Sequence, residues 1–371
     1  MKKNYQWLFA GVENILLQMH TLKMKGGELL TLHNNRPLYY HIIWTKEKKA
    51  EFDNFWKKHY GRTISANGHR YYEALNGIFH KDYFPEFLYT TKLEPKLNNF
   101  KYAQVYNDKN LFEILFAKSK NVKFPTTYAL NSGGTFYDHN RKVTSRQQVL
   151  ANLENVGKIV IKPTVGGSEG RGVEFYDILK GLDVYSKKRL SELFDGNQDY
   201  IIQEQVTQHP CNEKLHPMSL NSIRIITYIA ENNIHHAPLC LRMGTGSSKV
   251  DNLLAGGLLI GVSDDGTLNK YAYKLGNSKE RLTAHPDTHI EFDGYKIEGT
   301  RAIIEVAKEL HGFIPNIGII SWDIAFTSNS EVLVIEANFI GQSIRYPQIA
   351  HGKPIFGEHT PYMMKLISVS N

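Results

Sequence analysis

The sequence predicts an α+β protein built on antiparallel sheets, and three observations lead to this class. The first hundred or so residues are helical and aromatic in pattern, as in EFDNFWKKHYG (51–61) and HRYYEALNGIF (69–79). From residue 156 the pattern changes to short β-rich runs separated by turn residues. Neighbouring runs are joined by short turns, whereas the long crossovers that parallel strands require are scarce. We therefore expect hairpins and not a Rossmann fold.

Helices are expected beyond the aromatic region wherever apolar residues recur at helical spacing. The first is LFEILFAKSK (111–120), and a second covers residues 186–195. A third, TRAIIEVAKELHG (300–312), should end at Gly312 before Pro315, as helices commonly do.

The expected strands mostly pair in sequence order. VKFPTTYAL (122–130) comes first, and Pro125 should confine it to a sheet edge or to a strand start, because proline cannot donate to a ladder. The segments 222–230 and 234–243 should form a hairpin across the turn Glu231-Asn232-Asn233. A single strand is expected at 199–206, and further hairpins at 157–163 with 172–178, 256–262 with 267–274, and 318–326 with 331–339.

The charge and cysteine content bound the classes of partner. The net charge is +7, and Lys and Arg are spread along the chain without a block of like charge. This balance suits a cleft for phosphates or an acidic sugar, and no motif makes nucleic acid an expected partner. Cys211 and Cys240 lack CxxC or CxxH spacing, which implies neither a zinc site nor a disulfide framework and fits a reducing cytoplasm.

Membrane insertion is not expected. No run approaches the roughly 18 apolar residues of a membrane span, so the chain is predicted to be soluble. Residues 5–19 could form an amphipathic helix. Its polar face is not rich in Lys or Arg, so this helix is expected to cover its own domain and not a membrane surface.

The first segment that could carry chemistry is KIVIKPTVGGSEGRGVEFY (158–176). Lys162 ends a strand, and a glycine-rich loop leads into the returning strand. Glycines let backbone N–H groups approach a polyphosphate, while the lysine supplies a point charge. No GxxxxGK[ST] is present and a strand follows, so this is not a Walker A loop; an ordinary glycine-rich turn is the alternative. The predicted phosphate contacts in the loop are Gly166, Gly167, Ser168, Gly170 and Gly172.

The C-terminal hairpin gathers oxygen-bearing side chains. If its turn centres between Asn329 and Ser330, Asp323 lies directly opposite Glu336, and Asn338 shares that face. Two adjacent carboxylates repel each other unless a cation lies between them, and hard oxygen ligands suit Mg²⁺. A solvated strand face is the alternative, which the apolar residues on either side disfavour.

Two arginines and two further segments complete the candidates. Arg224 lies within the strand SIRIITYIA and Arg242 ends the next strand. Either could contact a phosphate or form an internal ion pair with a carboxylate. The segment 244–257 is either a substrate or phosphate loop or a plain polar connection, and the backbone of 201–206 could meet an adenine edge.

In order and spacing these segments resemble the ATP-grasp superfamily, and most closely its sugar-transfer-associated branch, found among cell-surface polysaccharide genes. The resemblance runs from about Phe55 to the end. It rests on FWKKHYG (55–61), Asp108-Lys109, IKPTVGGSEGRGV (161–173), HPMSLNSIRIITY (216–228), KVDNLLAGG (249–257), WDIAF (322–326) and IEAN (335–338).

The resemblance implies two α+β lobes with antiparallel sheets that close over ATP. A mainly helical region would span 1–105, the small lobe 106–198 and the large lobe 199–371. Lys109 and Lys162 would grip the ATP phosphates, and Glu213 is one candidate for a ribose contact that stays open. The adenine would meet Gln203, Glu204 and Val206; two Mg²⁺ ions would be held by Asp323, Glu336 and Asn338; and the transferred phosphoryl group would face Arg224, Arg242 and Asn252.

The activity that this resemblance implies is a carboxylate–amine ligase working through an acyl phosphate. The carboxylate would be a small molecule such as a uronic acid sugar, and the amine an amino acid, in polysaccharide biosynthesis. The alternatives are a kinase acting on a small acceptor and a MgATP-binding regulatory protein without turnover. A cysteine hydrolase on Cys211 with His209 or His216 is disfavoured, because no nucleophile elbow surrounds the cysteine.

Overall fold

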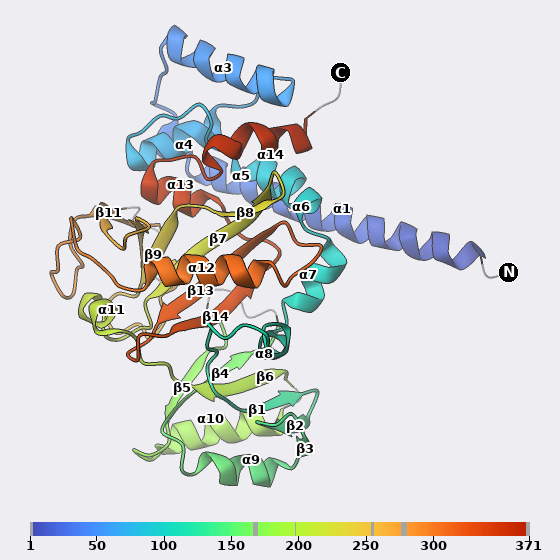
Figure 1. Cartoon of the computed structure of the whole chain (residues 1–371), viewed down its shortest axis with the longest axis vertical. Helices are drawn as coiled ribbons and strands as arrows, with labels where there is room; N and C mark the ends of the chain where they lie inside the picture. Colours follow the sequence, from blue (N-terminus) through green and yellow to red (C-terminus); the bar gives the residue numbers. More distant parts are fainter. Residues whose placement is uncertain (1–2, 166–169, 197, 254–255, 276–279, 369–371) are drawn as a thin grey trace.

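The computed structural model describes all residues except 1–2, 166–169, 197, 254–255, 276–279 and 369–371, and for residues 3–17 and 20 it describes the backbone only. Its long axis runs from a helical region through a large sheet to a smaller sheet at the other end (Figure 1). The large sheet has eight strands in the order β12-β11-β10-β9-β7-β13-β14, with β8 beside β7, and the small sheet has six in the order β3-β2-β1-β6-β4-β5. Strand pairs in both sheets are antiparallel, as predicted.

The helical region packs directly onto the large sheet. Trp56 and Phe84 share a core with Tyr228 on β7 and with Phe356 near the C-terminus, so this region is not a separate folding unit. Its elements are α1 (Lys3–Asn34), α2 (Arg36–Tyr39), α3 (Lys46–Tyr60), α4 (Asn67–Asn76), α5 (Glu86–Leu88), η1 (Tyr89–Leu93), α6 (Glu94–Leu97) and α7 (Phe100–Tyr106), joined by α13 (Arg345–His351), η4 (Gly357–His359) and α14 (Thr360–Leu366) from the other end of the chain.

The predicted amphipathic helix at 5–19 lies inside α1. Most of the side chains that would decide what its apolar side covers are outside the described residues. Among the helices that the structure describes, none is both long enough and apolar enough to cross a bilayer.

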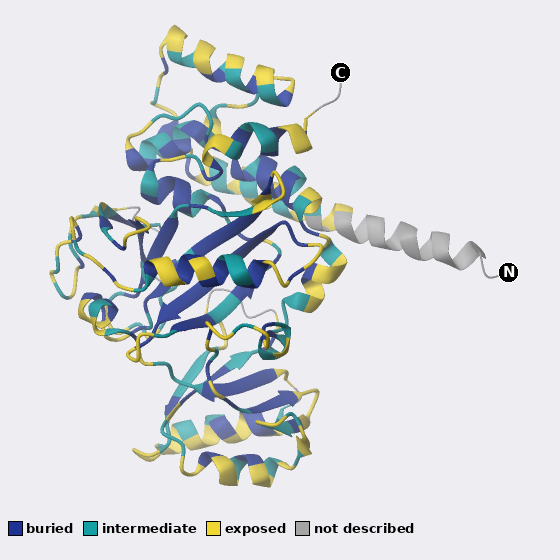
Figure 2. Ribbon diagram, viewed as in Figure 1, coloured by how far each residue is buried: buried dark blue, intermediate teal, exposed yellow. Residues whose placement is uncertain are grey.

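The small sheet is covered on one face by two helices, α9 (Arg146–Leu153) and α10 (Val184–Asp195), whose outer sides are exposed (Figures 1 and 2). Leu153 and Leu193 pack there against Ile159 and Ile161 of β4. The other face of the sheet is left to the large lobe. Its strands are β1 (Thr127–Ser132), β2 (Thr135–Asp138), β3 (Val143–Thr144), β4 (Lys158–Pro163), β5 (Glu174–Asp177) and β6 (Tyr200–Glu204).

Strand β6 belongs to the small sheet, where it lies between β1 and β4. A lobe border at 198/199 would separate it from both partners, and the chain passes to the large sheet only after Glu204. Sequence patterns show that a segment is a strand, but they do not show which sheet it joins.

The large sheet contains the longest buried strands. β13 is buried along its whole length (Figure 2). One of its faces packs against α12 (Thr300–His311), and on the other face Ile319 packs against the helical region. The strands of this sheet are β7 (Ser222–Ala230), β8 (Asn233–His236), β9 (Leu239–Met243), β10 (Leu258–Val262), β11 (Leu268–Lys274), β12 (Arg281–Leu282), β13 (Ile319–Phe326) and β14 (Val332–Asn338), and α11 (Pro210–Leu215) precedes β7.

Two segments differ from their predictions. The single strand expected at 234–243 is divided into β8 and β9, with Ala237 and Pro238 between them, because proline cannot donate to the ladder. The helix expected at 111–120 is only η2 (Lys109–Leu111) followed by α8 (Phe112–Leu115).

After α8 the chain runs beside β14 and then enters the small sheet. Lys123 pairs with β14, donating its N–H to Val332 O at 2.8 Å. Pro125 follows, and β1 of the small sheet begins at Thr127. The first half of the strand expected at 122–130 is therefore a crossing between the two sheets, and its second half is the start of β1. Pro125 lies just before this strand start, which was one of its two expected positions, and β1 is an interior strand of the sheet.

Candidate active site

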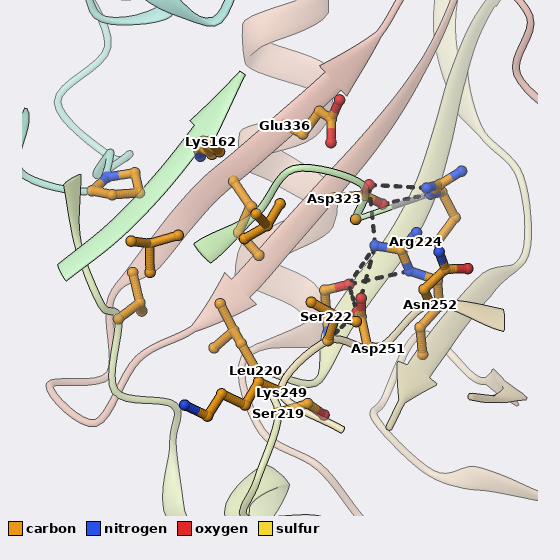
Figure 3. Close-up of a pocket in the computed structure, with 18 of the residues that line it drawn as sticks. Lys162, Ser219, Leu220, Ser222, Arg224, Lys249, Asp251, Asn252, Asp323 and Glu336 are labelled. Atoms are coloured by element: carbon orange, nitrogen blue, oxygen red, sulfur yellow. Dashed lines mark hydrogen bonds and ion pairs between the residues drawn. The ribbon is translucent and has the colours of Figure 1, made fainter. Parts of the chain in front are cut away.

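A cavity of about 730 Å³ lies between the two sheets (Figure 3). The small sheet contributes β4 and β5, and the large sheet contributes β7, β9, β13 and β14. The crossing after β6 and the loop 249–253 close its sides. The predicted site residues that line it are Lys109, Lys162, Gly170, Gln203, Glu204, Val206, Arg224, Arg242, Asn252, Asp323, Glu336 and Asn338.

The alternation of β4 gives the small-sheet wall its lysine. Ile159 and Ile161 point into the core, so Val160 and Lys162 face the cavity. Burial lowers the pKa of Lys162 to about 8, and the nearby charge of Lys109 acts in the same direction, while Glu336 opposes both. A buried cation beside another cation is poised to accept negative charge.

The glycine loop is described only at its two ends. Gly166, Gly167 and Ser168 lie outside the described residues. Gly170 and Gly172 have φ of 73° and 76°, a region that favours glycine. A Cβ on Gly172 would lie 2.9 Å from Cγ of Pro163, so this residue lets the returning strand pass close to the end of β4. Gly172 itself is not among the residues that line the cavity.

The end of β6 is held firmly against the start of β1. Glu204 accepts the N–H of Thr126 at its Oε1 (3.0 Å) and donates its own N–H to Thr126 O (2.9 Å). Gln203 Nε2 donates to Thr127 Oγ1 at 3.1 Å. Val206 follows and lines the cavity. These contacts fix the crossing segment between the lobes.

The large-sheet wall carries a buried network of paired charges (Figure 3). Arg224 donates to Asp323 through two nitrogens, Nε to Oδ1 at 2.5 Å and Nη2 to Oδ2 at 2.9 Å. Arg242 Nη2 lies 3.1 Å from Asp323 Oδ2 and donates to Ser222 Oγ at 2.9 Å. Asp251 accepts from the Ser222 hydroxyl and N–H and lies 3.5 Å from Arg242. Both arginines therefore form the internal ion pairs that were the alternative to a phosphate contact, and these pairs lie in the cavity wall.

The charge states of this network follow from its pairing. Burial would raise the pKa of Asp323, but the charges of Arg224 and Arg242 and their hydrogen bonds lower it below its ordinary value. Burial alone would lower the pKa of Arg242. The nearby carboxylates of Asp251, Asp323 and Glu336 outweigh this effect and raise the pKa above its ordinary value. Burial raises the pKa of Asp251, because Arg242 offsets only part of the effect.

The C-terminal hairpin has the predicted pairing. Asp323 lies opposite Glu336, and Asn338 opposite Ser321. The turn is centred on Asn329, half a residue earlier than expected, since Phe326 pairs with Val332, and a one-residue register shift between Asp323 and Ile324 restores the expected pairing. The carboxylates have separate protein cations, because Lys109 Nζ lies 3.0 Å from Glu336 Oε1 while the arginines bind Asp323.

Some cavity residues were not foreseen. Gln342, Ser343 and Tyr346 line the cavity next to Gly341, directly after the acidic hairpin. Their only sequence signal is a polar run after IEAN, which is weak. Glu213, the candidate for a ribose contact, lines the cavity from α11.

The cysteine alternative finds no support in the geometry. Cys211 Sγ lies 3.1 Å from His209 Nδ1, but neither residue lines the cavity. Burial raises the pKa of the Cys211 thiol, whereas a nucleophilic cysteine needs a lowered pKa.

Two α+β lobes that meet at a cavity, with lysines on one wall and a carboxylate–arginine network on the other, define a protein of the ATP-grasp type. The family described as sugar-transfer associated ATP-grasp matches residues 88–361, and the chain belongs to this family. No curated protein matches the sequence.

The solved structures to which this chain is similar are distant in sequence. N5-carboxyaminoimidazole synthetase from Staphylococcus aureus with ADP is 10% identical with a TM-score of 0.42, and the match covers 74% of this chain and 55% of the synthetase. D-alanine-D-alanine ligase from Coxiella burnetii is 13% identical with a TM-score of 0.40, and the match covers 73% of this chain and 59% of the ligase. VanG D-Ala:D-Ser ligase from Enterococcus faecalis is 12% identical with a TM-score of 0.42, and the match covers 71% of this chain and 61% of the ligase. The chain thus spans somewhat more than half the length of each.

Proposed function

We propose that this chain is an ATP-dependent carboxylate–amine ligase that works through an acyl phosphate. The observation that carries the proposal is that one cavity unites Lys109 and Lys162 with Glu336 and with the Arg224–Asp323–Arg242 network. Cations from the small lobe and carboxylates and arginines from the large lobe are what a phosphoryl transfer needs on its two sides.

The triphosphate would lie along the lysine wall. Lys162, whose pKa is lowered by burial and by Lys109, would gain a counter-charge from the phosphates. Lys109 reaches the same place from η2, and its N–H donates to Thr164 O at 3.2 Å, which ties it to the end of β4. The adenine would meet the fixed segment Gln203, Glu204 and Val206.

The acidic hairpin offers oxygens that suit Mg²⁺. Glu336 and Asn338 are partly exposed in the cavity, and Lys109 Nζ lies 3.0 Å from Oε1 of Glu336. Both oxygens of Asp323 already accept from guanidinium groups, so Glu336 and Asn338 are the better ligands, with Asp323 beside them. Mg²⁺ keeps several waters and needs few protein groups. When bound, it would neutralise charge on the phosphates.

The arginines would act on the acceptor side. A carboxylate oxygen attacks the γ-phosphorus, the bond from this phosphorus to the β-bridging oxygen breaks, and ADP leaves. The amine then attacks the acyl carbon, and inorganic phosphate leaves as the nitrogen loses a proton. Because Arg224 and Arg242 are held in place by Asp323, they can stabilise developing charge without reorganising. Asn252 lines the cavity beside them.

The proposed substrates are a uronic acid sugar and an amino acid in a surface glycan pathway. The family's sugar-transfer association and the net charge of +7 support an acidic sugar.

The test is a product analysis with MgATP, a panel of uronic-acid nucleotides and amino acids, and hydroxylamine in parallel. We expect ADP, phosphate and a new amide by mass spectrometry, and a hydroxamate where hydroxylamine replaces the amine. A stable phosphorylated product without amide would instead identify a kinase, and tight MgATP binding without ADP release a regulatory protein. Glu336→Ala should abolish turnover, whereas Glu331→Ala, near the turn of the same hairpin and outside the cavity, should not.

A further inference from the structure

We propose that His216, His285 and Asp287 form a second metal site, for a zinc-like divalent ion, behind the cavity wall. One ligand atom from each residue lies within 4.8 Å of the others. None of the three lines the nucleotide cavity, so this site is distinct from the oxygen ligands of the acidic hairpin. Its position does not depend on the reaction that the chain catalyses.

The carboxylate lies midway between the two imidazoles. Asp287 Oδ2 is 3.8 Å from His216 Nδ1 and 3.8 Å from His285 Nδ1. The two rings are stacked, with centroids 5.1 Å apart and planes at 25°. Ligands about 2.1 Å from a tetrahedral Zn²⁺ lie about 3.4 Å from each other, so an ion would draw the carboxylate and each imidazole together by a few tenths of an ångström. The two imidazole nitrogens, which lie within 4.8 Å of each other, would approach by up to about 1.4 Å.

The ring of His285 is already turned as a metal ligand needs. Its Nε2 lies 3.0 Å from Gly244 O, and since a carbonyl only accepts, Nε2 carries the proton. This leaves a lone pair on Nδ1, toward Asp287. Among the described residues this lone pair accepts one weak hydrogen bond, from the N–H of Asp287 at 3.3 Å, which a bound ion would replace. Metal-bound histidines are commonly oriented by a carbonyl in this way.

The ring of His216 supplies an independent observation. It is 1% exposed, and both of its nitrogens are buried without a hydrogen-bond partner among the described residues. Its backbone is fixed, because its carbonyl accepts from Gln208 at 3.0 Å and from Asn221 at 2.9 Å. Buried polar groups without a partner are costly and rare, and a metal ion on Nδ1 would satisfy one of these nitrogens.

The donor set decides the kind of ion. Two imidazoles and one carboxylate suit Zn²⁺ and related first-row ions, whereas Mg²⁺ prefers oxygen ligands only. The side chain of Asp287 is 41% exposed, so water can complete the coordination. Its Oδ2 also accepts the N–H of Gly246 at 2.6 Å, which orients the carboxylate from behind.

The ion would join two parts of the cavity wall. His216 directly precedes the segment 217–220, which lines the cavity. Gly246, held by Asp287, begins the loop that leads to Asp251 and Asn252. We therefore assign the site a structural role: it holds the substrate side of the cavity together.

The experiment uses the full chain without an affinity tag, freed of metal by a chelator and kept in excess Mg²⁺ without nucleotide. Equilibrium dialysis against Zn²⁺ should load one ion per chain and raise the melting temperature, and Co²⁺ should give the visible absorption of a low-coordinate site with nitrogen ligands. Asp287→Asn keeps an acceptor for Gly246, so it should fold, and it should weaken Zn²⁺ binding by at least about tenfold. His285→Gln should do the same.

His139→Gln is the matched control, since His139 lies in the turn that follows β2, in the other lobe. It should leave zinc content, melting shift and cobalt spectrum as in the wild type. The proposal is overturned if the wild type loads no more zinc than Asp287→Asn, or if the cobalt spectrum is the same in all three variants. These readouts involve no turnover, so they are independent of whether the chain proves to be a ligase.

Discussion

The two walls of the cavity differ in how their buried charges are compensated. On the large-sheet wall the charges are matched within the protein, with Asp323 between Arg224 and Arg242 and with Asp251 close by. On the small-sheet side Lys162 is lowered in pKa by burial and by a second cation. The first wall is therefore complete before any ligand arrives, whereas the second has positive charge to offer to one.

This difference suggests a division of labour. A paired network costs nothing further to assemble when the substrate binds, so it can hold reacting groups in a fixed geometry. A buried cation with incomplete pairing contributes binding energy for a polyanion, because the ligand supplies the missing charge. Changes on the two walls should thus have different signatures, one in stability and the other in nucleotide affinity.

The largest effect is expected from breaking the paired wall. Asp323→Ala leaves two buried guanidinium groups without their shared carboxylate. Removing one partner of a buried ion pair costs about 3–5 kcal/mol, so the free energy of unfolding should fall by this amount in a denaturant titration. A loss of less than about 1 kcal/mol would show that the network does not stabilise the wall.

Glu336→Gln is the matched comparison on the same hairpin. Its side chain is 28% exposed, against 4% for Asp323. It should therefore change the free energy of unfolding by less than about 1 kcal/mol while abolishing turnover. Equal destabilisation by the two variants would erase the distinction between the walls.

The second effect concerns Lys162 and nucleotide affinity. Lys162→Met should weaken ATP binding roughly tenfold to a hundredfold, the range for losing a hydrogen bond to a charged group. The pKa of about 8 gives a direction with pH: as pH rises through this value the free protein loses the proton that the phosphates need, so affinity should decline. Calorimetric titrations from about pH 7 to about pH 9 should show this decline in the wild type.

The variant decides whether Lys162 is responsible. In Lys162→Met the decline should be absent, and in Lys180→Met, an exposed lysine after β5, it should remain. A decline that persists in Lys162→Met would assign the titration to another group.

How much the sequence could predict differs between these walls too. The glycine hairpin and the acidic hairpin are local, so turn residues and alternation were enough to place Lys162 on β4 and to set Asp323 opposite Glu336. The acidic hairpin also contains a bulge that keeps Asp323 opposite Glu336, and the sequence pattern does not predict this bulge. Most of the remaining site residues came from the family resemblance.

The paired network could not be predicted, because its partners are far apart in the chain. Arg224 and Asp323 are 99 residues apart and meet only because β7 lies beside β13. Periodicity identifies strands but not their neighbours, and for the same reason it did not place β6 in the small sheet. The pairing of His216 with Asp287 is equally long-range.

A smaller effect is expected behind the large-sheet wall, at the buried carboxyl of Glu94. Burial raises its pKa to about 8, although the N–H groups of Gly341 and Gln342 oppose this. The folded chain therefore keeps a proton that the unfolded chain releases near pH 4.5, and stability should fall as pH rises between these values. The slope should be about 1 kcal/mol per pH unit.

Glu94→Gln keeps the acceptor for the Gly341 N–H, a 2.8 Å bond in the wild type, but cannot titrate. Denaturant titrations from about pH 5 to about pH 7.5 should show a flatter slope than in the wild type. Glu51→Gln, an exposed carboxylate changed in the same way, should not flatten it. Parallel slopes for wild type and Glu94→Gln would show that Glu94 is ionised in the folded chain.

The smallest effect tests whether the lysine wall depends on close backbone packing. In Gly172→Ala the new Cβ would meet Pro163 at 2.9 Å with φ at 76°, so about 1 kcal/mol of stability should be lost and the end of β4 should shift. Gly133→Ala is the control, because φ is 58° there but nothing lies within 4 Å of the added atom. The difference between the two variants isolates the contact with Pro163. If that contact positions Lys162, ATP affinity falls in Gly172→Ala alone, and if affinity is the same in both variants, the lysine is placed by β4 without help from the glycine loop.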